Sequence, residues 1–388
     1  MSMTDPRATV EQVIDSIHPS LIEMSRRIHA RPEIAFEEVY ASGLLGDRLE
    51  SERFAVQRGV AGMATAVRGS AGPGPLHVVL VCEYDALPVV GHACGHNVIC
   101  AAGLGAGIGL LAVAEGLGLR VTVLGTPAEE GGGGKIQLIE AGLFHDVHAA
   151  LMVHPAPRDT LEPWILAAQT LEVAYTGREA HAAGAPEKGI NAADAFVVAQ
   201  VAIGLLRQHL PASTRVHGIV THGGDAPNII PASTTGRFMV RATDIDALAA
   251  VRERVIACFE AGALATGARL AVEPRVRYAH MVQDRDLLDA YGQNAVALGR
   301  SLVPTEESGL GPVSTDMGDV SLVVPSIHPM IGIDSLPSVN HQPGFTDAAA
   351  SPAADRAIRD GALAMAWTVI DAASDQHIRA RLLGRAVS

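Results

Sequence analysis

The chain has 388 residues, of which 48% are hydrophobic and 18% charged, and its formal net charge is −13. Such a composition is globular and provides apolar residues for about two domains. The acidic balance, without any run of Lys or Arg, argues against nucleic-acid binding, because phosphate neutralisation needs clustered cations. We find no apolar segment of about eighteen residues that would span a bilayer and no secretory signal, so we expect a cytoplasmic protein that binds no membrane.

Helices and strands alternate through the first part of the chain. Apolar residues at spacings of three and four predict helices on both sides of a break at 29–32, where a proline stands. This alternation predicts an α/β domain with a mostly parallel sheet and helices on both faces. Strands are expected at 64–67, 76–81, 121–125 and 149–153, a buried helix at 99–115, and another helix from Lys135.

The pattern changes near Gln169 to strand, helix, strand, strand, helix, strand. This is the split βαβ order of a ferredoxin-like α+β domain, and it predicts an inserted domain at 168–282. The α/β domain would then consist of 1–167 and 283–388. Its last part is expected to hold a helix at 287–302, a polar loop at 314–320, a return to the sheet at 325–333 and a terminal helix at 347–370.

Side chains able to bind metal gather after the most apolar predicted strand. Glu83 and Asp85 follow this strand, and His92, Cys94 and His96 alternate with small residues just beyond. Thiolate, imidazole and carboxylate together suit zinc or a similar divalent ion. Asp85 is expected to orient a ligand imidazole, or else to cap the strand end. The alternative for the whole segment is a glycine-rich loop with incidental histidines.

The cysteines divide into one candidate ligand and three core residues. Cys94 stands in the cluster just described, whereas Cys82, Cys100 and Cys258 are expected to be buried small hydrophobic residues. Disulfides are not expected in a cytosolic chain.

Further candidate ligands stand where later strands end. Glu130 follows the strand at 121–125, His154 follows the strand at 149–153, and His341 lies in a later loop. In open parallel sheets ligands bind beyond the carboxyl ends of the strands, so we expect these side chains to converge. Together they would supply about the ligands that two ions need. The candidate set is Cys94, His96, Glu130, His154 and His341.

The adjacent pair Glu129 and Glu130 is typical of a catalytic metal site. One carboxylate can serve as a ligand while its neighbour acts as a general base; the alternative is two surface acids. The following glycines, Gly131–Gly134, allow close backbone approach, as they would also allow a flexible turn. A phosphate-binding P-loop is not indicated, because Ile136 follows Lys135 where Ser or Thr is needed.

Taken together, these motifs resemble the two-metal peptidases that include aminoacylase, carboxypeptidases, hippurate hydrolase and indole-acetyl-amino-acid hydrolase. Short Pro88-to-His92 spacing and Asn97 are similar to the p-aminobenzoyl-glutamate and β-alanyl-dipeptide hydrolases within that family. The resemblance covers nearly the whole chain, and it is carried by the segments 27–33, 84–88, 92–96, 127–131, 177–183, 228–231 and 314–318.

The resemblance implies a metallo-amidohydrolase or peptidase that cleaves the amide bond of an N-acyl amino acid or dipeptide-like substrate, such as a p-aminobenzoyl-glutamate-like or β-alanyl-dipeptide-like molecule. Two divalent ions are implied, with zinc expected and manganese or cobalt as alternatives. The α/β domain would be catalytic and of zinc-peptidase type. The insert at 168–282 would be a lid through which a homodimer forms.

The resemblance also assigns roles. It makes Cys94 the bridging ligand and Glu129 the general base, and it implies that His181 polarises the scissile carbonyl in the partner subunit's active site. Asp85 and His92 would lie beside the ligands. Substrate binding is implied for Asn228, Arg241, Ser314 and Thr315.

Three alternatives remain open. The chain could be a dipeptidase or aminopeptidase that needs a free amine, a catalytically silent binding subunit with the same fold, or a structural zinc protein. The complete ligand set argues against the silent subunit. A structural zinc site is closed by four ligands, and the paired glutamates argue against it.

Overall fold

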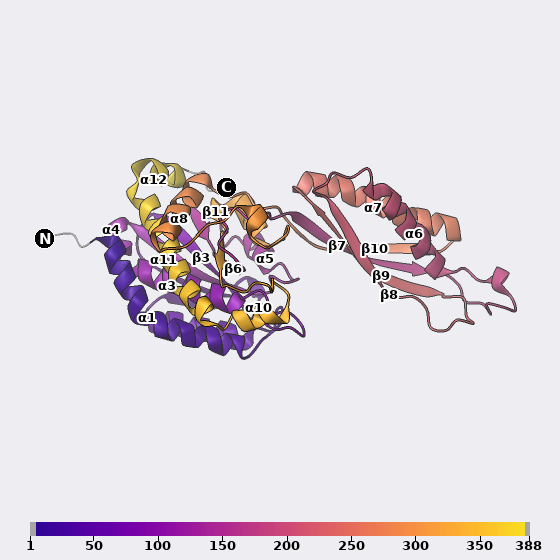
Figure 1. The fold of residues 1–388 in the computed structure, drawn as a ribbon, viewed down its shortest axis with the longest axis horizontal. Coiled ribbons are helices and arrows are strands. Elements are labelled where there is room, and N and C mark those ends of the chain that lie inside the picture. The colour runs from indigo at the N-terminus through magenta and orange to yellow at the C-terminus, as the bar shows by residue number, and fades with distance from the viewer. Residues whose placement is uncertain (1–4, 385–388) are drawn as a thin grey trace. The chain divides into compact units, whose positions relative to one another are not determined.

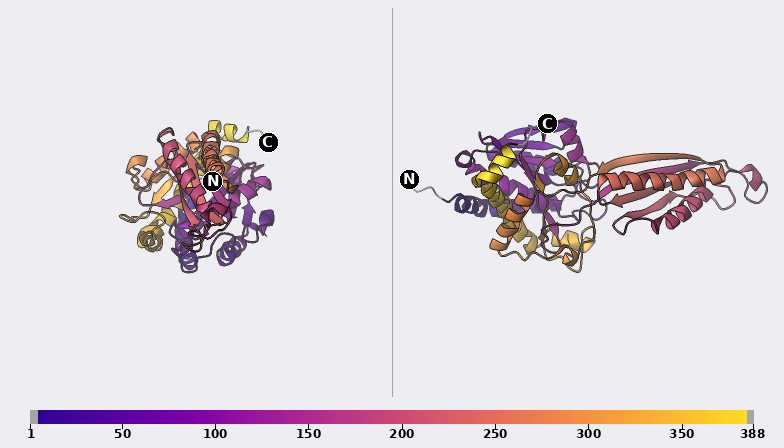
Figure 2. Two further views of the ribbon diagram at one scale, coloured as in Figure 1. Left: turned by 90° about the vertical axis from the view of Figure 1, so that its right-hand side faces the viewer. Right: turned by 90° about the horizontal axis from the view of Figure 1, so that it is seen from above.

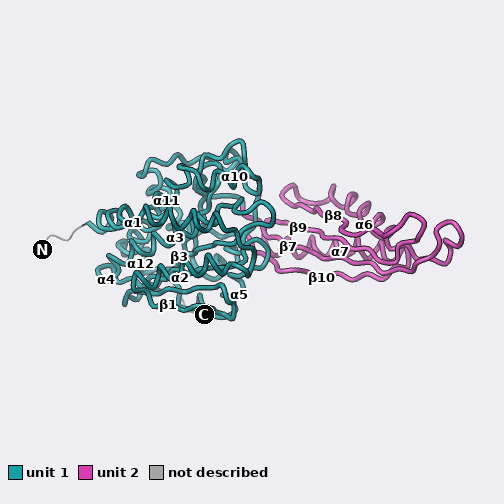
Figure 3. The backbone as a smooth tube through the Cα atoms, turned by 90° about the horizontal axis from the view of Figure 1, so that it is seen from below, with its two compact units in different colours: residues 1–164, 281–388 teal, residues 165–280 magenta. Residues whose placement is uncertain are grey.

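The computed structural model describes residues 5–384, whose helices and strands are shown in Figure 1 and Figure 2. The chain divides into two compact units (Figure 3). The first comprises residues 1–164 and 281–388, and the second comprises residues 165–280. The small unit is therefore inserted into the chain of the large one.

The domain boundaries expected from the sequence, 168 and 282, fall within three residues of these divisions. The ends of the expected catalytic domain include residues 1–4 and 385–388, which lie outside the described residues. The roles of the two domains, catalytic centre and lid, stay predictions at this point.

The large unit is built on a six-stranded sheet in the order β1-β2-β4-β3-β5-β11. Its four strands from β4 to β11 are parallel neighbours, whereas β1 and β2 pair in antiparallel fashion at one edge. A separate parallel pair is formed by β6 and β12. The strands are β1 (Ala55–Arg58), β2 (Val67–Ala71), β3 (Leu76–Glu83), β4 (Leu119–Thr126), β5 (Ala149–Leu151), β6 (His154–Ala156), β11 (Ser326–Ile327) and β12 (Met330–Gly332).

Strand β3 is buried along its whole length because helices cover both faces of the sheet. Val78 and Leu80 belong to the core that contains α1, α3 and α11, whereas Val79 and Val81 belong to the core that contains α5 and α9. This explains the uninterrupted apolar run in the sequence. The helices are α1 (Pro6–His29), α2 (Val39–Ser51), α3 (His96–Leu111), α4 (Ala114–Leu117), α5 (Gly134–Glu140), α8 (Arg285–Ala297), α9 (Met317–Val323), α10 (Pro343–Ala348), α11 (Pro352–Ser374) and α12 (Gln376–Leu383).

Two expectations for the large unit differ from the structure. The strand expected at 64–67 lies at Val67–Ala71, where backbone pairing with β4 places it. The loop expected at 314–320 becomes helix α9 from Met317 onward. Its polar first residues concealed a short helix whose Met317 and Val320 are buried in the core.

The small unit is a four-stranded antiparallel sheet in the order β10-β7-β9-β8, with α6 and α7 packed on one face around a shared core. This order confirms the expected ferredoxin-like insert. Cys258 on α7 is only half-buried, because it lies at the edge of this core. The elements are β7 (Ala167–Thr176), α6 (Ala192–Arg207), β8 (Arg215–His222), β9 (Ser233–Ala242), α7 (Ile245–Thr266) and β10 (Arg269–Tyr278).

Within residues 5–384, none of the helices is both long enough and apolar enough to cross a membrane.

A buried imidazole near the start of β3 links stability to pH. The Nε2 atom of His77 lies 2.8 Å from Thr122 Oγ1, and its Nδ1 lies 3.0 Å from the carbonyl oxygen of Asp146. Burial, reinforced by Arg120, lowers the pKa of His77 from 6.5 to about 4. The unfolded chain therefore takes up this proton first as the pH falls. The stability that neutral His77 provides is complete above pH 6.5 and is lost as the pH approaches 4.

We expect His77→Gln to flatten the acid dependence of folding. The wild-type protein should lose roughly 2–3 kcal/mol of its free energy of unfolding through this group between pH 7 and pH 4. Urea unfolding at several pH values measures the slope. His377→Gln, at an exposed position, is the matched control. Equal slopes in the wild type and His77→Gln would contradict the assignment.

Candidate metal centre

The candidate ligands lie beyond the carboxyl ends of the central strands. Strand β4 ends just before the turn at 127–130, and His154 begins β6 directly after β5. Helix α3 starts at His96, after the left-handed residue Gly95 (φ 74°). A side chain at Gly95 would come within 2.9 Å of the Pro155 ring, so only glycine fits between the two neighbouring ligands. Parallel topology thus brings distant segments to one edge of the sheet.

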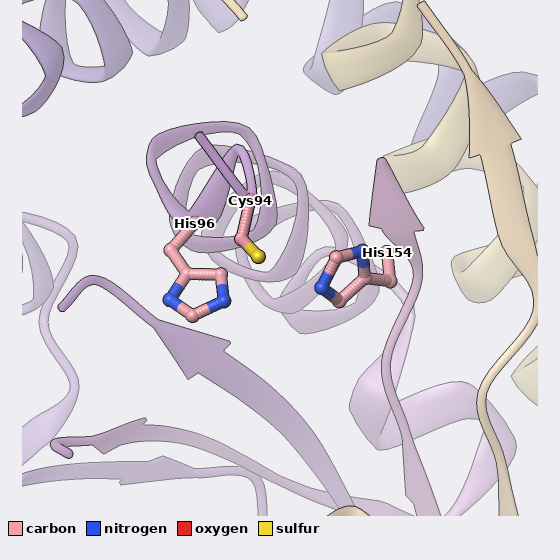
Figure 4. A group of neighbouring side chains, drawn as sticks. All are labelled: Cys94, His96 and His154. Carbon is pink, nitrogen blue, oxygen red and sulfur yellow. The ribbon is translucent and has the colours of Figure 1, made fainter. Parts of the chain in front are cut away.

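Two groups of three candidate ligands form there. Ligand atoms of Cys94, His96 and His154 lie within 4.8 Å of one another, and so do those of Cys94, Glu130 and His341. Figure 4 shows the thiol of Cys94 pointing into the space between the rings of His96 and His154. The two groups share Cys94 and no other residue. The structure therefore brings together all five ligands expected from the sequence.

Hydrogen bonds leave one ring nitrogen of each buried histidine for the centre. The Nδ1 atom of His96 lies 3.1 Å from Asp85 Oδ1, and the other Asp85 oxygen accepts the backbone N–H of Glu130 at 2.9 Å. The Nδ1 atom of His154 lies 2.8 Å from the carbonyl oxygen of Pro155. The Nε2 atoms of both rings are consequently the ones available to a metal.

Two residues of the centre's loops adopt left-handed backbone conformations. His341 has φ 70°, and its N–H donates to the carbonyl of Ala93 at 2.9 Å. Ala128, just before Glu129, has φ 60°, and its N–H donates to the buried carboxylate of Glu38 at 2.8 Å. Such backbone strain persists only where the surroundings hold it, and it is concentrated at functional sites.

The buried atoms of the centre fit a cation. Within residues 5–384, His96 Nε2 and Glu130 Oε1 are buried without a hydrogen-bond partner. Burial and the neighbouring Glu130 raise the pKa of the Cys94 thiol well above its usual range, and burial lowers the pKa of His154 to about 3. A bound cation favours the thiolate and the neutral imidazole. Burial, together with Glu83 and Glu130, also raises the pKa of Glu129.

Known proteins share this sequence and fold. Residues 168–266 match a domain described as a peptidase dimerisation domain. The chain is 40% identical over 376 residues to the Xaa-Arg dipeptidase of Mus musculus, and the match covers 92% of this chain and 86% of that protein. The chain belongs to the M20 family of peptidases. Its membership confirms the family resemblance and the expected class of metallo-amidohydrolase or peptidase.

Two further M20 relatives are more distant. A p-aminobenzoyl-glutamate hydrolase polypeptide of Escherichia coli is 31% identical over 278 residues, which cover 66% of this chain and 58% of that protein. A solved Bacillus subtilis structure, described as a dinuclear metal-binding peptidase from the M20 family, has a TM-score of 0.68 and 22% identity. It covers 90% of this chain and 98% of its own. The mixed α/β fold with an inserted dimerisation domain is confirmed.

Sequence reasoning missed a buried lysine beside the centre of this M20 chain. Lys135 is fully buried, and its Nζ lies 2.5 Å from Glu83 Oε1 and 2.5 Å from Asp316 Oδ1. Burial disfavours the charge on Glu83, but Lys135 and then His96 outweigh it and lower the pKa of Glu83 to about 2. The signal in the sequence was a lysine directly after four glycines.

A second missed residue is His328, which follows β11 as His154 follows β5. The two rings stack with centroids 5.5 Å apart. Both ring nitrogens of His328 are buried without a hydrogen-bond partner among the described residues, and burial lowers its pKa to about 4. Its place at a strand end could have marked it.

The remaining expected residues of the large unit have mixed surroundings. His92 is buried and stacks on His29, with ring centroids 6.0 Å apart. Thr315 is buried, and its hydroxyl accepts the N–H of Met317 at 3.1 Å, which is a helix-capping contact. Substrate contacts of Ser314 and Thr315 stay predictions.

In the small unit, the expected residues lie on one loop pair and one strand. The exposed His181 accepts the N–H groups of Ala183 and Gly184 at Nδ1, at 3.2 and 3.0 Å. The N–H of Ala182 donates to the carbonyl of Asn228 at 3.0 Å, which joins the two loops. Arg241 lies on β9, and burial lowers its pKa. Their substrate contacts also stay predictions.

The shared position of Cys94 predicts how metal binding responds to substitution. We expect Cys94→Ala to reduce the metal content from about two ions per chain to near zero, because both ligand groups lose a member. His154→Ala and His341→Ala should each lose about one ion. Elemental analysis after dialysis measures the content. Cys258→Ala, in the small unit, is the matched control, and full retention by Cys94→Ala would refute the shared ligand.

Proposed function

We propose that the protein is a metal-dependent dipeptidase that hydrolyses dipeptides with a basic C-terminal residue such as arginine. The observation that carries this proposal is the 40% identity to the mouse Xaa-Arg dipeptidase, which extends over 86% of that protein. The proposal favours the dipeptide-like substrate and the dipeptidase alternative of the sequence analysis over simple N-acyl amino acids. An N-acyl amino acid would lack the amine of a dipeptide.

Two divalent ions would be held by the two ligand groups. Cys94, His96 and His154 would hold one, and Cys94, Glu130 and His341 the other. Bound ions of this kind supply Lewis-acid activation of water and of the scissile carbonyl. Thiolate and imidazole ligands favour zinc, with manganese and cobalt as alternatives.

Glu129 is the proposed general base. Its side chain is nearly buried, and its Oε2 lies 3.9 Å from His96 Nε2, at the border of the ligand group. There it can take the proton of the attacking water and then deliver it to the amine of the leaving residue. The neighbouring Glu130 is engaged through its backbone by Asp85, and its Oε2 lies 3.8 Å from His341 Nε2. The two glutamates therefore face different groups.

His181 is the proposed donor to the scissile carbonyl. Because its Nδ1 accepts two backbone N–H groups, the neutral ring carries its proton on Nε2. This nitrogen is then free to stabilise the negative charge that develops on the carbonyl oxygen. We assign the substrate's carbonyl or carboxylate to Asn228 and Arg241, and the pocket wall to Ser314 and Thr315.

A homodimer formed through the small unit completes the proposal. Helix α6 exposes Val197, Val201 and Leu205, which are spaced four residues apart and share one face. Strand β8 is an edge strand with an exposed Ile219. An exposed apolar stripe and a free sheet edge in one unit favour association, and the match to a peptidase dimerisation domain supports the same conclusion.

A second candidate is hydrolysis of p-aminobenzoyl-glutamate-like amides. The identity to the Escherichia coli hydrolase polypeptide and the short spacing between Pro88 and His92 favour it. The match covers only 58% of that polypeptide, which makes this the weaker proposal.

A matched substrate panel tests the function. We expect the metal-loaded protein to cleave alanyl-arginine and β-alanyl-lysine, and to lose this activity in a chelator. Alanyl-glutamate tests the need for a basic residue, and N-acetyl-arginine tests the need for a free amine. Chelator-sensitive cleavage of p-aminobenzoyl-glutamate alone would favour the second candidate. Cleavage of neither substrate class by protein that retains its metal would refute both.

Mixed dimers test the roles of Glu129 and His181 together. We expect Glu129→Gln to keep its metal but to lower turnover by about 10²- to 10⁴-fold, and His181→Ala to be similarly impaired. Glu140→Gln, on an exposed position of α5, is the matched control.

After subunit exchange between Glu129→Gln and His181→Ala, activity should rise to about a quarter of the wild-type value. About half of the dimers are then mixed, and each holds one complete site. Light scattering checks that dimers exchange. No recovery in verified mixed dimers would show that His181 does not act on the partner subunit's site.

A further inference from the structure

A buried charge group lies next to the candidate ligands. It joins Lys135 to Glu83 at the end of β3 and to Asp316 just before α9. The backbone N–H of Lys135 also donates to Asp316 Oδ2 at 3.0 Å. All three side chains are fully buried. The proposed hydrolysis assigns them no task.

The glycine run explains how a lysine reaches this interior position. A side chain at Gly134 would come within 2.0 Å of the carbonyl oxygen of Pro127, so only glycine lets α5 begin against the turn at 127–130. Lys135 is in the first turn of α5 and is buried there. The glycines therefore serve close packing. They place a cation beside the turn that carries Glu129.

The same region contains a third possible ligand group. Ligand atoms of Glu83, His96 and Glu129 also lie within 4.8 Å of one another. The Nε2 atom of His96 is 3.4 Å from Glu83 Oε2, and it is the ring nitrogen not engaged by Asp85. One nitrogen binds one cation, so this group competes with Cys94 and His154 for His96.

Occupation of the third group would be unproductive. A cation held by Glu83, His96 and Glu129 would remove His96 from the group that contains Cys94. It would also engage the carboxylate that the proposed hydrolysis needs as a base. The protein must therefore disfavour this position.

We propose that Lys135 is a positioning residue that excludes a divalent cation from the group of Glu83, His96 and Glu129. Its ammonium contacts Glu83 at 2.5 Å, and its charge repels a second cation there. Asp316 holds the ammonium from the other side through a hydrogen bond of 2.5 Å. A lysine between two buried carboxylates is difficult to displace, because its departure leaves uncompensated charge. Lys135 thereby keeps His96 for the metal that Cys94 binds, and keeps Glu129 free.

This inference rests on the metal centre of the proposed function but not on the substrate. Its test therefore measures metal coordination without any substrate present. Cobalt is a suitable probe, because a cobalt–thiolate bond to Cys94 gives a near-ultraviolet charge-transfer band. The chain contains only two lysines, so Lys188→Met, at an exposed position, is a matched control for Lys135→Met.

We expect Lys135→Met, loaded with cobalt, to lose at least about half of the thiolate band of the wild type while its cobalt content per chain is unchanged or higher. Adding Glu83→Gln to Lys135→Met should restore the band, because the competing carboxylate is gone. A merely structural lysine would not give this rescue. A wild-type band in folded Lys135→Met, or no rescue in the double variant, would overturn the proposal.

Glu83→Gln alone keeps the proposal testable if Lys135→Met does not fold. With Lys135 present, Glu83 is not a ligand, so this variant should keep the cobalt content and thiolate band of the wild type. Loss of either in folded protein would overturn the proposal. A wild type that shows the band but cleaves no panel substrate would refute only the proposed function.

Discussion

The carboxylate of Asp85 is the contact on which the geometry of the centre depends. One of its oxygens lies against the Nδ1 atom of His96, and the other accepts the N–H of Glu130. These two residues belong to different ligand groups and to segments that follow different strands. A single buried carboxylate thus fixes the ring nitrogen that faces the centre, and at the same time fixes the turn that carries the paired glutamates. Such supporting contacts decide ligand orientation as much as the ligands themselves do.

Charge balance is the second constraint on this region. The carboxylates of Glu83, Asp85, Glu129 and Asp316 are all nearly or fully buried within one small volume, and Lys135 is the buried ammonium among them. Uncompensated charge of this kind is costly in a protein interior. Metal binding and the ion pairs of Lys135 therefore act on the same electrostatic problem, and cation binding here should be coupled to folding.

The sequence predicted the parts of the centre that depend on local pattern and sheet topology. His154 and Glu130 stand where strands end, and parallel topology requires such ends to meet. It could not predict the partner of Lys135, because Asp316 is 181 residues away and precedes a helix whose first residues are polar. His328 was missed for the same reason, since its stacking on His154 arises only in the folded chain. Pairing between distant segments, and not residue type, separates the predicted residues from the missed ones.

The division of labour between two adjacent glutamates has a physical origin in the backbone before them. Ala128 is held in a left-handed conformation by its hydrogen bond to the buried Glu38, whose other oxygen accepts the hydroxyl proton of Thr65. This strain turns the chain so that Glu129 approaches His96 while Glu130 approaches His341. A relaxed turn would not hold the two carboxylates toward different groups. Glu38, remote in sequence and no ligand itself, therefore belongs to the machinery that separates a base from a ligand.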